Sequence, residues 1–391
     1  MNLKNGLFVT HEGIGSSIFR SQVLEHCISM KKLGYNLDIL TYEIFSSNWN
    51  KSVINLKKYS KSNSINLKKA IWIYYPFSEL FNLFILIIDL FKSKKTYHFI
   101  HARADYTAFL CIILKPFHHL PVVWDCRGDS VDEMKFSSSK YNLFIRLYFK
   151  LLIIPRFKLY RSINKKFANK IVYVSNALKD DISIYKSKKS IVIPCPVPSK
   201  HFGFDKILRQ NFRKKLGFEK NHSVYIYSGS MIGYQSIEKY LYFFKSILNN
   251  PNNRLIIATV DLEKAKSIFK SILSKNLIFK SIEYEKMNNY YCASDFALLL
   301  REPRPLNYVA SPTKFGEYCL SGLKVIHNNS IAQVFEITSV LKNGSKISTE
   351  TIQKLDDNKR ELISINSKQF FSREFSNKSY HKLYNKILKN T

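Results

Sequence analysis

The segment SPTKFGE carries the residues best suited to bind a phosphorylated ligand. We predict that Ser311 caps a helix and that Pro312 takes its first position, where a missing N–H costs nothing. The free amides of Thr313 and Lys314 then lie at the positive helix end, where anions bind. Glu317 lies one turn further along the same face and is suited to bind a ribose diol. An ion pair on an exposed helix is the alternative interpretation.

Three more residues of the second half follow predicted strands. Gly229 and Ser230 come after VYIYS, and Arg301 comes after DFALLL. Ligands of parallel α/β sheets bind beyond the carboxyl ends of the strands. We therefore expect loop amides at Gly229 and Ser230, together with the Arg301 side chain, to assist in phosphate binding.

Two glycines in the first half suit the same ligand. Gly13 and Gly15 follow the first predicted strand, where a missing side chain lets backbone amides approach a phosphate or a sugar. GIGSSI lacks the third glycine of a dinucleotide-binding fingerprint, so a nicotinamide enzyme is poorly supported. A plain turn is the alternative.

Charged residues are concentrated in WDCRGDSVDE, directly after a predicted strand. We predict that Asp125 and Arg127 line the reaction centre, with the arginine stabilising charge on a leaving phosphate. His101 and Arg103, at the end of the preceding strand, are further candidates. A structural Asp–Arg pair that braces the loop is the alternative.

These residues need elements to position them, and the chain alternates short apolar runs with helical stretches. The predicted strands of the first half are Gly6–Thr10, Leu37–Tyr42, Ala70–Tyr74, His98–Ala102, Val122–Asp125 and Ile171–Val174. Those of the second half are Val224–Gly229, Arg254–Thr259, Ile282–Tyr284, Asp295–Leu300 and Lys324–Asn328. Strands separated by helices predict right-handed βαβ units and parallel sheets.

Three prolines in IVIPCPVPS interrupt this alternation and indicate a domain crossing. We predict two Rossmann-like, doubly wound α/β domains that face a central cleft. Residues 1–197 form the N-terminal domain, and residues 198–366 form the C-terminal domain, which holds the predicted phosphate and ribose site. Residues 367–391 form a final helix that packs back near the junction.

The composition narrows the possible partners. The 391 residues carry a formal net charge of +32. A compositional bias toward Lys, Asn and Ile explains this excess, and so does attraction to anionic membranes or phosphorylated substrates. The lysines are spread along the whole chain, so no nucleic-acid partner is expected. Six cysteines without a CxxC pair predict neither a metal site nor disulfides.

We expect a cytoplasmic protein, because the chain starts with a strand-like run and not with a signal peptide. The apolar run Leu80–Phe91 is far shorter than the roughly 20 residues that span a bilayer, and predicts a buried or interfacial helix. Residues 144–170 resemble two basic amphipathic helices broken at Pro155, which suit an anionic membrane surface. Ordinary packing with a solvated basic face is the alternative. The polar residues 49–66 predict an exposed loop.

Several motifs, in order, resemble those of GT-B glycosyltransferases of the family 4 type, among them bacterial surface polysaccharide glycosyltransferases. They are GIGSS, VVWDCRGD, IVYVSNALKD, IVIPCPV, YIYSGS and SPTKFGEYCLSGLKVI. The resemblance implies a hexosyltransferase that takes its sugar from a nucleoside diphosphate, of uridine or guanosine, with retention and without a metal or cofactor. It also implies a lipid-linked or polysaccharide acceptor, as in lipopolysaccharide or capsule synthesis, on the side of residues 1–197, with the nucleotide sugar bound by residues 198–366.

The chain departs from this family at two places. The family often carries two glutamates eight residues apart; the second matches Glu317, but Val309 occupies the position of the first. Asn307, Glu302 or Arg301 are the candidates to replace it. The loop SGSMIGYQS also lacks the basic residues that the family commonly has there. A GT-B sugar-nucleotide epimerase and a non-catalytic glycan-assembly partner therefore stay open as alternatives.

Overall fold

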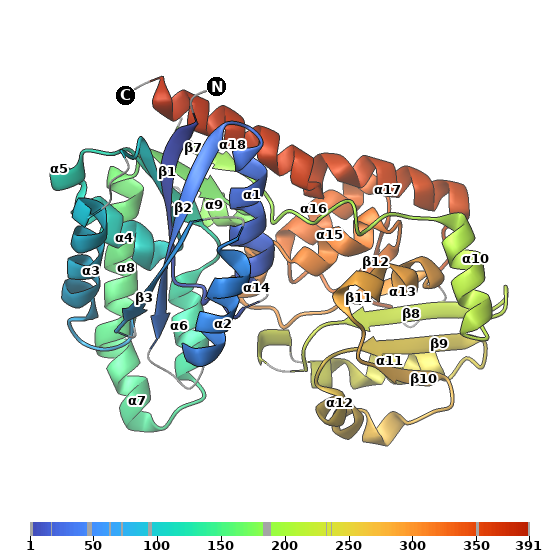
Figure 1. The fold of residues 1–391 in the computed structure, drawn as a ribbon. Helices are drawn as coiled ribbons and strands as arrows, with labels where there is room; N and C mark the ends of the chain where they lie inside the picture. The colour runs from blue at the N-terminus through green and yellow to red at the C-terminus, as the bar shows by residue number, and fades with distance from the viewer. Residues whose placement is uncertain are drawn as a thin grey trace. The chain divides into compact units, whose positions relative to one another are not determined.

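The computed structural model describes residues 3–16, 18–44, 49–61, 64–71, 73–92, 96–182, 189–231, 233–235, 237–348 and 352–389. The chain divides into two compact units (Figure 1). Unit 1 comprises Met1–Ile193 and Ser376–Thr391, and unit 2 comprises Pro194–Phe375. Unit 2 is therefore one continuous stretch inserted into the chain of unit 1.

Unit 1 is built on a parallel sheet of seven strands in the order β3-β2-β1-β4-β5-β6-β7. The strands are β1 (Lys4–Thr10), β2 (Tyr35–Ile44), β3 (Ile65–Ala70), β4 (Phe99–Arg103), β5 (Val122–Cys126), β6 (Lys170–Tyr173) and β7 (Ser190–Val192). The helices are η1 (Phe19–Leu24), α1 (Glu25–Lys31), α2 (Trp49–Tyr59), α3 (Ser78–Lys92), α4 (Asp105–Ile113), α5 (Lys115–His118), α6 (Ser130–Ser138), α7 (Leu143–Tyr148), η2 (Phe149–Ile153), α8 (Ile154–Phe167) and α9 (Asn176–Ile182).

Unit 2 has a parallel sheet of six strands in the order β10-β9-β8-β11-β12-β13. The strands are β8 (Ser223–Ser228), β9 (Asn253–Ala258), β10 (Leu277–Lys280), β11 (Phe296–Leu299), β12 (Lys324–His327) and β13 (Gly344–Lys346). The α-helices are α10 (Lys206–Lys215), α11 (Leu241–Leu248), α12 (Leu262–Ile268), α13 (Met287–Ala293), α14 (Pro305–Tyr308), α15 (Thr313–Leu320), α16 (Ala332–Leu341) and α17 (Asp357–Phe371). The short 3-10 turns are η3 (Gly233–Gln235), η4 (Ile237–Tyr240), η5 (Lys270–Ile272) and η6 (Tyr284–Lys286).

Both sheets have the strand order of a doubly wound fold, which confirms the predicted α/β class. The order reverses between β1 and β4 in unit 1 and between β8 and β11 in unit 2. Ligands of open parallel sheets bind beyond the carboxyl ends of the strands that flank such a reversal. Loops after β1, β4, β8 and β11 are thus the places where a site is expected.

Several predicted boundaries were wrong. The strand expected at Ala70–Tyr74 is β3, which ends at Ala70, and the edge strand expected at Ile282–Tyr284 is β10, which ends at Lys280. Both strands are short edge strands, whose apolar signal is weak. The predicted loop at 49–66 contains α2, because the partly buried Leu56 and Tyr59 pack on the core beneath a polar face. Strand β7, within the predicted crossing, and strand β13 were missed.

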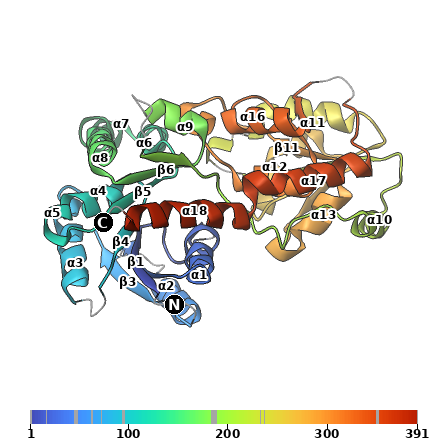
Figure 2. The same cartoon turned by 90° about the horizontal axis from the view of Figure 1, so that it is seen from above.

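The predicted final helix is two helices, α17 and α18 (Arg373–Leu388), separated by the extended residue Ser372. The carbonyl of Phe371 accepts a hydrogen bond from the Val197 amide at 2.8 Å, which satisfies the end of α17. From Ser376 onward, α18 belongs to unit 1. Seen from above, it crosses the strands of unit 1 beside α1 (Figure 2). Its residues in that core are Tyr380, Leu383, Tyr384 and Ile387.

Arg360 anchors α17 to unit 2. Its guanidinium is buried and donates to main-chain carbonyls at the ends of α13 and α15, where helix dipoles concentrate negative charge. Burial lowers the pKa of Arg360 to about 9, but these acceptors stabilise its charged form. The accepting carbonyls belong to Tyr291 (3.2 Å), Ser294 (2.8 Å), Ser321 (3.3 Å) and Gly322 (3.1 Å).

Among the described helices, none combines the length and the apolar character that crossing a bilayer requires.

Candidate active site

The helix predicted to bind phosphate is α15, and it starts one residue later than expected. Pro312 is the N-cap residue, and Thr313 is the first helical residue. The prediction that Ser311 caps the helix was wrong: its hydroxyl accepts a hydrogen bond from the Cys195 amide at 3.0 Å. Ser311 therefore fixes the loop before the helix. The first turn still leaves the Thr313 and Lys314 amides without acceptors inside the helix.

Glu317 is a buried carboxylate and not one half of an exposed ion pair. The residue is 2% exposed. Its Oε2 accepts hydrogen bonds from Lys314 Nζ and from the Tyr291 hydroxyl, each at 2.9 Å. The Tyr291 hydroxyl also lies 3.1 Å from Ser228 Oγ, at the end of β8. Burial raises the pKa of Tyr291 well above its ordinary value, so the phenol keeps the proton that it donates to Glu317.

The other residues predicted to bind the donor are differently placed. The Gly229 amide already donates to the Ala258 carbonyl at 3.1 Å, and Ser230 Oγ accepts from Gln235 Nε2 at 2.7 Å. These two residues brace their own loop. Arg301 is held at its carbonyl by the Tyr240 hydroxyl at 2.6 Å. Its guanidinium acts electrostatically on Tyr318, the neighbour of Glu317 in sequence.

Two of the three candidates to replace the missing glutamate, Glu302 and Asn307, are engaged with other residues of the protein. Val309 is buried. Glu302 pairs with Arg304 at 3.0 Å and with Lys239 at 2.6 Å. The Asn307 amide donates to the Glu302 carbonyl at 2.8 Å. Glu302 and Asn307 therefore serve the conformation of the loop in this structure.

In unit 1, the predicted catalytic residues are brought together around one buried carboxylate. Asp125 Oδ1 lies 3.2 Å from Arg127 Nη1, and Asp125 Oδ2 lies 3.4 Å from both Arg103 Nη1 and His101 Nε2. The parallel register of β4 and β5 sets Arg103 beside Asp125. Burial alone would raise the pKa of Asp125, but Arg127, His101 and Arg103 outweigh it and hold this pKa below the ordinary range. Asp125 is therefore ionised near neutral pH.

Two residues that the sequence analysis missed complete this cluster. Glu12, two residues after β1, accepts from Arg103 Nε at 2.8 Å. Gln22 accepts from Arg127 Nη2 at 3.0 Å. Gln22 lies in η1, a π-helical segment of the kind that often marks functional sites. The position of Glu12 at a strand end, beside the Gly13 turn, was the signal that could have identified it.

His101 is deeper than its prediction as a catalytic group implied. It is 1% exposed and stacks on Phe8 with ring centroids 4.4 Å apart. Its Nδ1 lies 2.7 Å from the Tyr384 hydroxyl of α18, which also lies 2.9 Å from His26 Nε2. Burial lowers the pKa of His101, so the ring is neutral near pH 7. Its position suits orienting Asp125 and not contacting a substrate. No local sequence pattern around His101 could reveal its contact with Tyr384, because the two residues are far apart in the sequence.

Gly13 and Gly15 form the turn after β1. Gly13 has a φ of 74°, a conformation that favours glycine. The Ile14 amide between them donates to Glu43 Oε1 at 2.5 Å. Glu43 therefore already occupies an amide of the turn that the sequence analysis assigned to a phosphate or a sugar.

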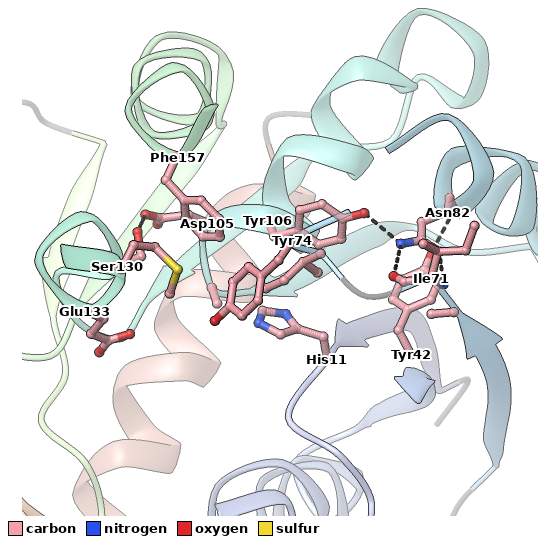
Figure 3. Close-up of a pocket in the computed structure, with 14 residues that line it drawn as sticks. His11, Tyr42, Ile71, Tyr74, Asn82, Asp105, Tyr106, Ser130, Glu133 and Phe157 are labelled. Atoms are coloured by element: carbon pink, nitrogen blue, oxygen red, sulfur yellow. Dashed lines mark hydrogen bonds between the residues drawn. The ribbon is translucent and has the colours of Figure 1, made fainter. Parts of the chain in front are cut away.

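A cavity of about 250 Å³ opens beside this cluster in unit 1 (Figure 3). Its lining includes His11, directly before Glu12, and Asp105, two residues after Arg103. Asp105 accepts from Trp124 Nε1 at 3.1 Å and from the Ser130 hydroxyl, and it pairs with Arg161 at 3.4 Å. Among the described residues of the chain, no group of three His, Cys, Asp or Glu side chains is arranged to hold a metal ion.

No protein-family model matches this sequence, and no curated protein matches it. Solved structures do. HepE from Anabaena, in complex with UDP, matches at 11% identity and a TM-score of 0.69, over 98% of this chain and 100% of that chain. A glycosyltransferase from Rickettsia africae matches at 16% identity and a TM-score of 0.69, over 100% of both chains. The chain has the GT-B fold.

A third GT-B match is the lipopolysaccharide outer core galactosyltransferase WaaB. It is 11% identical, with a TM-score of 0.66, over 98% of this chain and 99% of that chain. Further HepE structures hold UDP with glucose, and UDP-glucose. Likeness at such low identity concerns the fold, and it confirms the GT-B fold that the motifs implied.

Proposed function

We propose that this protein transfers a sugar from a nucleoside-diphosphate sugar to a hydroxyl of a lipid-linked or polysaccharide acceptor in surface glycan synthesis. The observation that carries the proposal is Glu317, a buried carboxylate held by Lys314 and Tyr291 at the start of α15. An ionised carboxylate is seldom buried without a functional or structural reason. The UDP and UDP-glucose complexes of structures with this fold support a nucleotide sugar as its ligand.

In this proposal unit 2 binds the donor. The Thr313 and Lys314 amides and the Lys314 ammonium neutralise the diphosphate, and Glu317 accepts hydrogen bonds from the ribose hydroxyls. Lys314 is partly exposed, with 27% of its side chain accessible, so its amine can reach a phosphate while the Glu317 carboxylate stays buried. Uridine or guanosine diphosphate is the proposed nucleotide.

Unit 1 contributes to the transfer step. Arg127 stabilises the negative charge that develops on the leaving phosphate, and Asp125 with Gln22 fixes its guanidinium. The bond between the anomeric carbon and the phosphate oxygen breaks, and the acceptor oxygen forms the new bond on the same face. The acceptor proton passes to an oxygen of the leaving diphosphate, so the step needs no protein base. Positive charge comes from protein groups, so the reaction is proposed to need no metal.

Nucleotide binding tests the first part of this proposal. Titration calorimetry with UDP and GDP should give saturable binding of one of them, unchanged by EDTA. Lys314→Ala and Glu317→Ala should each weaken it about tenfold or more, which is about 1.4 kcal/mol. Lys324→Ala, a change in the same unit but outside α15, is the matched control. Equal affinity in all variants would refute this donor site.

Turnover of the bound nucleotide sugar tests the second part. Slow hydrolysis without acceptor, with retention at the anomeric carbon by NMR, is the expected result. Interconversion of the sugar while it stays on the nucleotide would instead identify an epimerase. Absence of nucleotide binding would favour a non-catalytic assembly partner.

We also propose that unit 1 lies on the cytoplasmic face of an anionic plasma membrane. Contacts of Arg156 join α8 to the start of α3: its guanidinium pairs with Glu79 and donates to the Tyr75 carbonyl at 3.3 Å. Exposed apolar side chains gather on α3 and on α7 with η2, including Phe84 at 60% and Phe144 at 82%. The full set, named the apolar surface, is Leu80, Phe81, Phe84, Phe91, Leu143, Phe144, Ile145, Leu147, Leu151 and Leu152.

Two basic residues of 144–170 are engaged within unit 1: Arg156 pairs with Glu79, and Arg161 pairs with Asp105 and Asp129. Arg146, Lys150 and Lys158 are exposed beside the apolar surface. Exposed apolar residues flanked by cations are typical of binding at an anionic membrane interface.

Vesicle co-sedimentation tests the membrane proposal. Binding to vesicles that contain phosphatidylglycerol should exceed binding to neutral vesicles and should weaken with salt. Phe84→Ser with Phe144→Ser, and separately Arg146→Gln with Lys150→Gln, should each reduce it about tenfold. Phe335→Ser, an exposed apolar change in unit 2, is the control. Binding unchanged in both double variants would refute this surface.

A further inference from the structure

The cavity of unit 1 is lined by both aromatic and polar side chains (Figure 3). It lies just beyond the carboxyl ends of the strands around the β1–β4 reversal, where α/β folds bind ligands. The aromatic lining residues are Tyr42, Tyr74, Tyr106 and Phe157. The polar lining residues are His11, Asn82, Asp105, Ser130 and Glu133.

One side of the cavity is fixed by a hydrogen-bond network around Asn82. The Asn82 amide group donates to the Ile71 carbonyl at 3.0 Å and to the Tyr106 hydroxyl at 2.7 Å. The Tyr42 hydroxyl donates to the Asn82 carbonyl at 3.2 Å. Side chains locked in this way form a preorganised wall, and a wall of this kind binds a ligand without having to be ordered first.

The lining also contains a polar atom that the protein does not satisfy. Among the described residues, His11 Nδ1 has no hydrogen-bond partner although this atom is buried. Burial lowers the pKa of His11, so its ring is neutral near pH 7 and can donate at one nitrogen and accept at the other. A buried nitrogen without a partner is costly, and a ligand hydroxyl would satisfy it.

The backbone is strained at the same place. Ala104, which lines the cavity, has a φ of 74°, which is uncommon for a residue with a Cβ atom. Its amide donates to the Asp125 carbonyl at 2.9 Å. Strain of this kind gathers at ligand sites, where the surrounding structure maintains it. The cavity and the Asp125–Arg127 cluster are therefore built from adjoining residues.

The charge of the cavity contrasts with that of the whole chain. None of the described lining residues is a lysine or an arginine, whereas the chain carries a net charge of +32. Asp105 is compensated by Arg161. Desolvation, and then the charges of Asp105, Glu12 and Asp129, raises the pKa of Glu133 to about 7. Glu133 is still solvent-accessible, and solvent screening therefore moderates this shift.

We propose that this cavity binds a single uncharged sugar ring of the acceptor. Local carboxylates repel an anionic ligand, and the positive field of the chain disfavours a cationic one. Its volume, about 250 Å³, is below the roughly 300–1,000 Å³ of pockets for drug-sized ligands, so it suits one monosaccharide. The ring packs on Tyr74, and its hydroxyls bind His11 and Ser130. This inference depends on the proposed sugar transfer, because it names the acceptor of that reaction.

Pairs of ligands that differ only in charge test it. Methyl β-D-glucopyranoside and its uronate, with the galacto and manno pairs, are titrated into the full chain in the presence of UDP and followed by saturation-transfer NMR. In at least one pair the neutral glycoside should bind about tenfold more tightly than the uronate. Saturable binding of no neutral glycoside, or tighter binding of the uronates or of methyl glucosaminide, would overturn the proposal.

Variants locate the binding. Tyr74→Ala should abolish binding of the neutral glycoside. Tyr75→Ala removes a tyrosine side chain that is not part of the lining, and should preserve this binding. Glu133→Lys should reverse the preference within each pair, and Glu263→Lys, on the surface of unit 2, should leave it unchanged. Binding that ignores both Tyr74→Ala and Glu133→Lys would overturn this location. Melting temperatures of all variants establish that they are folded.

The same experiment separates this inference from the proposed function. Lys314→Ala should lose UDP while it keeps the neutral glycoside. If UDP-sugar turnover persists and no glycoside binds, the cavity assignment fails and sugar transfer stands. If glycosides bind and no nucleotide sugar does, the proposed transfer fails.

Discussion

At the scale of residues, the guanidinium of Arg127 is held from two sides, by Asp125 and by Gln22. Such preorganisation lets its charge act on a transition state without reorganisation. Arg127→Ala should lower kcat about 10²- to 10³-fold, with UDP affinity changed less than about twofold. Arg127→Lys should be intermediate, because it keeps the charge and loses the planar fork. Steady-state kinetics with calorimetry test this, and near-normal turnover of Arg127→Ala would exclude the role.

The buried His101 makes stability depend on pH. Its pKa is lowered in the folded state, so below about pH 6.5 the unfolded chain binds protons that the folded chain does not. The free energy of unfolding should therefore decrease as the pH falls below that value, by up to about 1.4 kcal/mol per pH unit for this histidine. Urea unfolding between neutral and mildly acidic pH measures the slope.

His101→Gln should flatten that slope by the contribution of one proton, since glutamine does not titrate. A slope equal in His101→Gln and in the unmodified chain would contradict the assignment. The pKa of Asp125 is also lowered in the folded state, but by its positively charged neighbours and not by burial. Asp125 therefore adds stability that is lost only at more acidic pH.

At the scale of elements, α15 has to approach its neighbours closely. A Cβ on Gly316 would lie 2.8 Å from Val197 Cγ2 and 3.1 Å from the Phe371 ring. Gly316→Ala gains up to about 1 kcal/mol of helix propensity but overpacks this contact at a cost of about 1–3 kcal/mol. We expect net destabilisation of about 1 kcal/mol by urea unfolding, with weaker UDP binding because Lys314 and Glu317 flank this glycine.

Gly203→Ala is the matched control, because a Cβ there meets no atom within 4 Å. It should change stability by less than about 0.5 kcal/mol. A Gly316→Ala variant as stable as Gly203→Ala would show that α15 has room to shift.

At the scale of the whole molecule, patterns of apolar residues predicted the two parallel sheets, because central strands such as β1 and β8 are continuous buried runs. The bounds predicted for the edge strands β3 and β10 were wrong, because many of their residues are only partly buried and give a weaker apolar pattern. The roles of the candidate site residues stay predictions, but Asp125 and Arg127 were singled out from their position at a strand end, and Lys314 and Glu317 from a helix start signal. Tyr384 and Tyr291 were not, because side chains brought together only by tertiary packing leave no local spacing signal.

The last helix is essential to unit 1. Tyr380, Leu383, Tyr384 and Ile387 are buried in its core, at roughly 1.5–3 kcal/mol for each large apolar side chain. The total free energy of unfolding of a domain is typically about 5–15 kcal/mol. Removing residues 376–391 should therefore take away most of the stability of unit 1. We expect limited proteolysis to degrade residues 1–193 of the shortened chain while residues 194–375 resist. Equal resistance of both parts would contradict this.

The insertion of unit 2 into the chain of unit 1 also sets an order in time. Residues 194–375 are synthesised as one uninterrupted stretch, before the residues of α18 that belong to unit 1 are added. Unit 1 must wait for Tyr384, the residue that its buried histidines contact. During synthesis, the chain of the part proposed to hold the nucleotide sugar is therefore complete before the chain of the part proposed to use it.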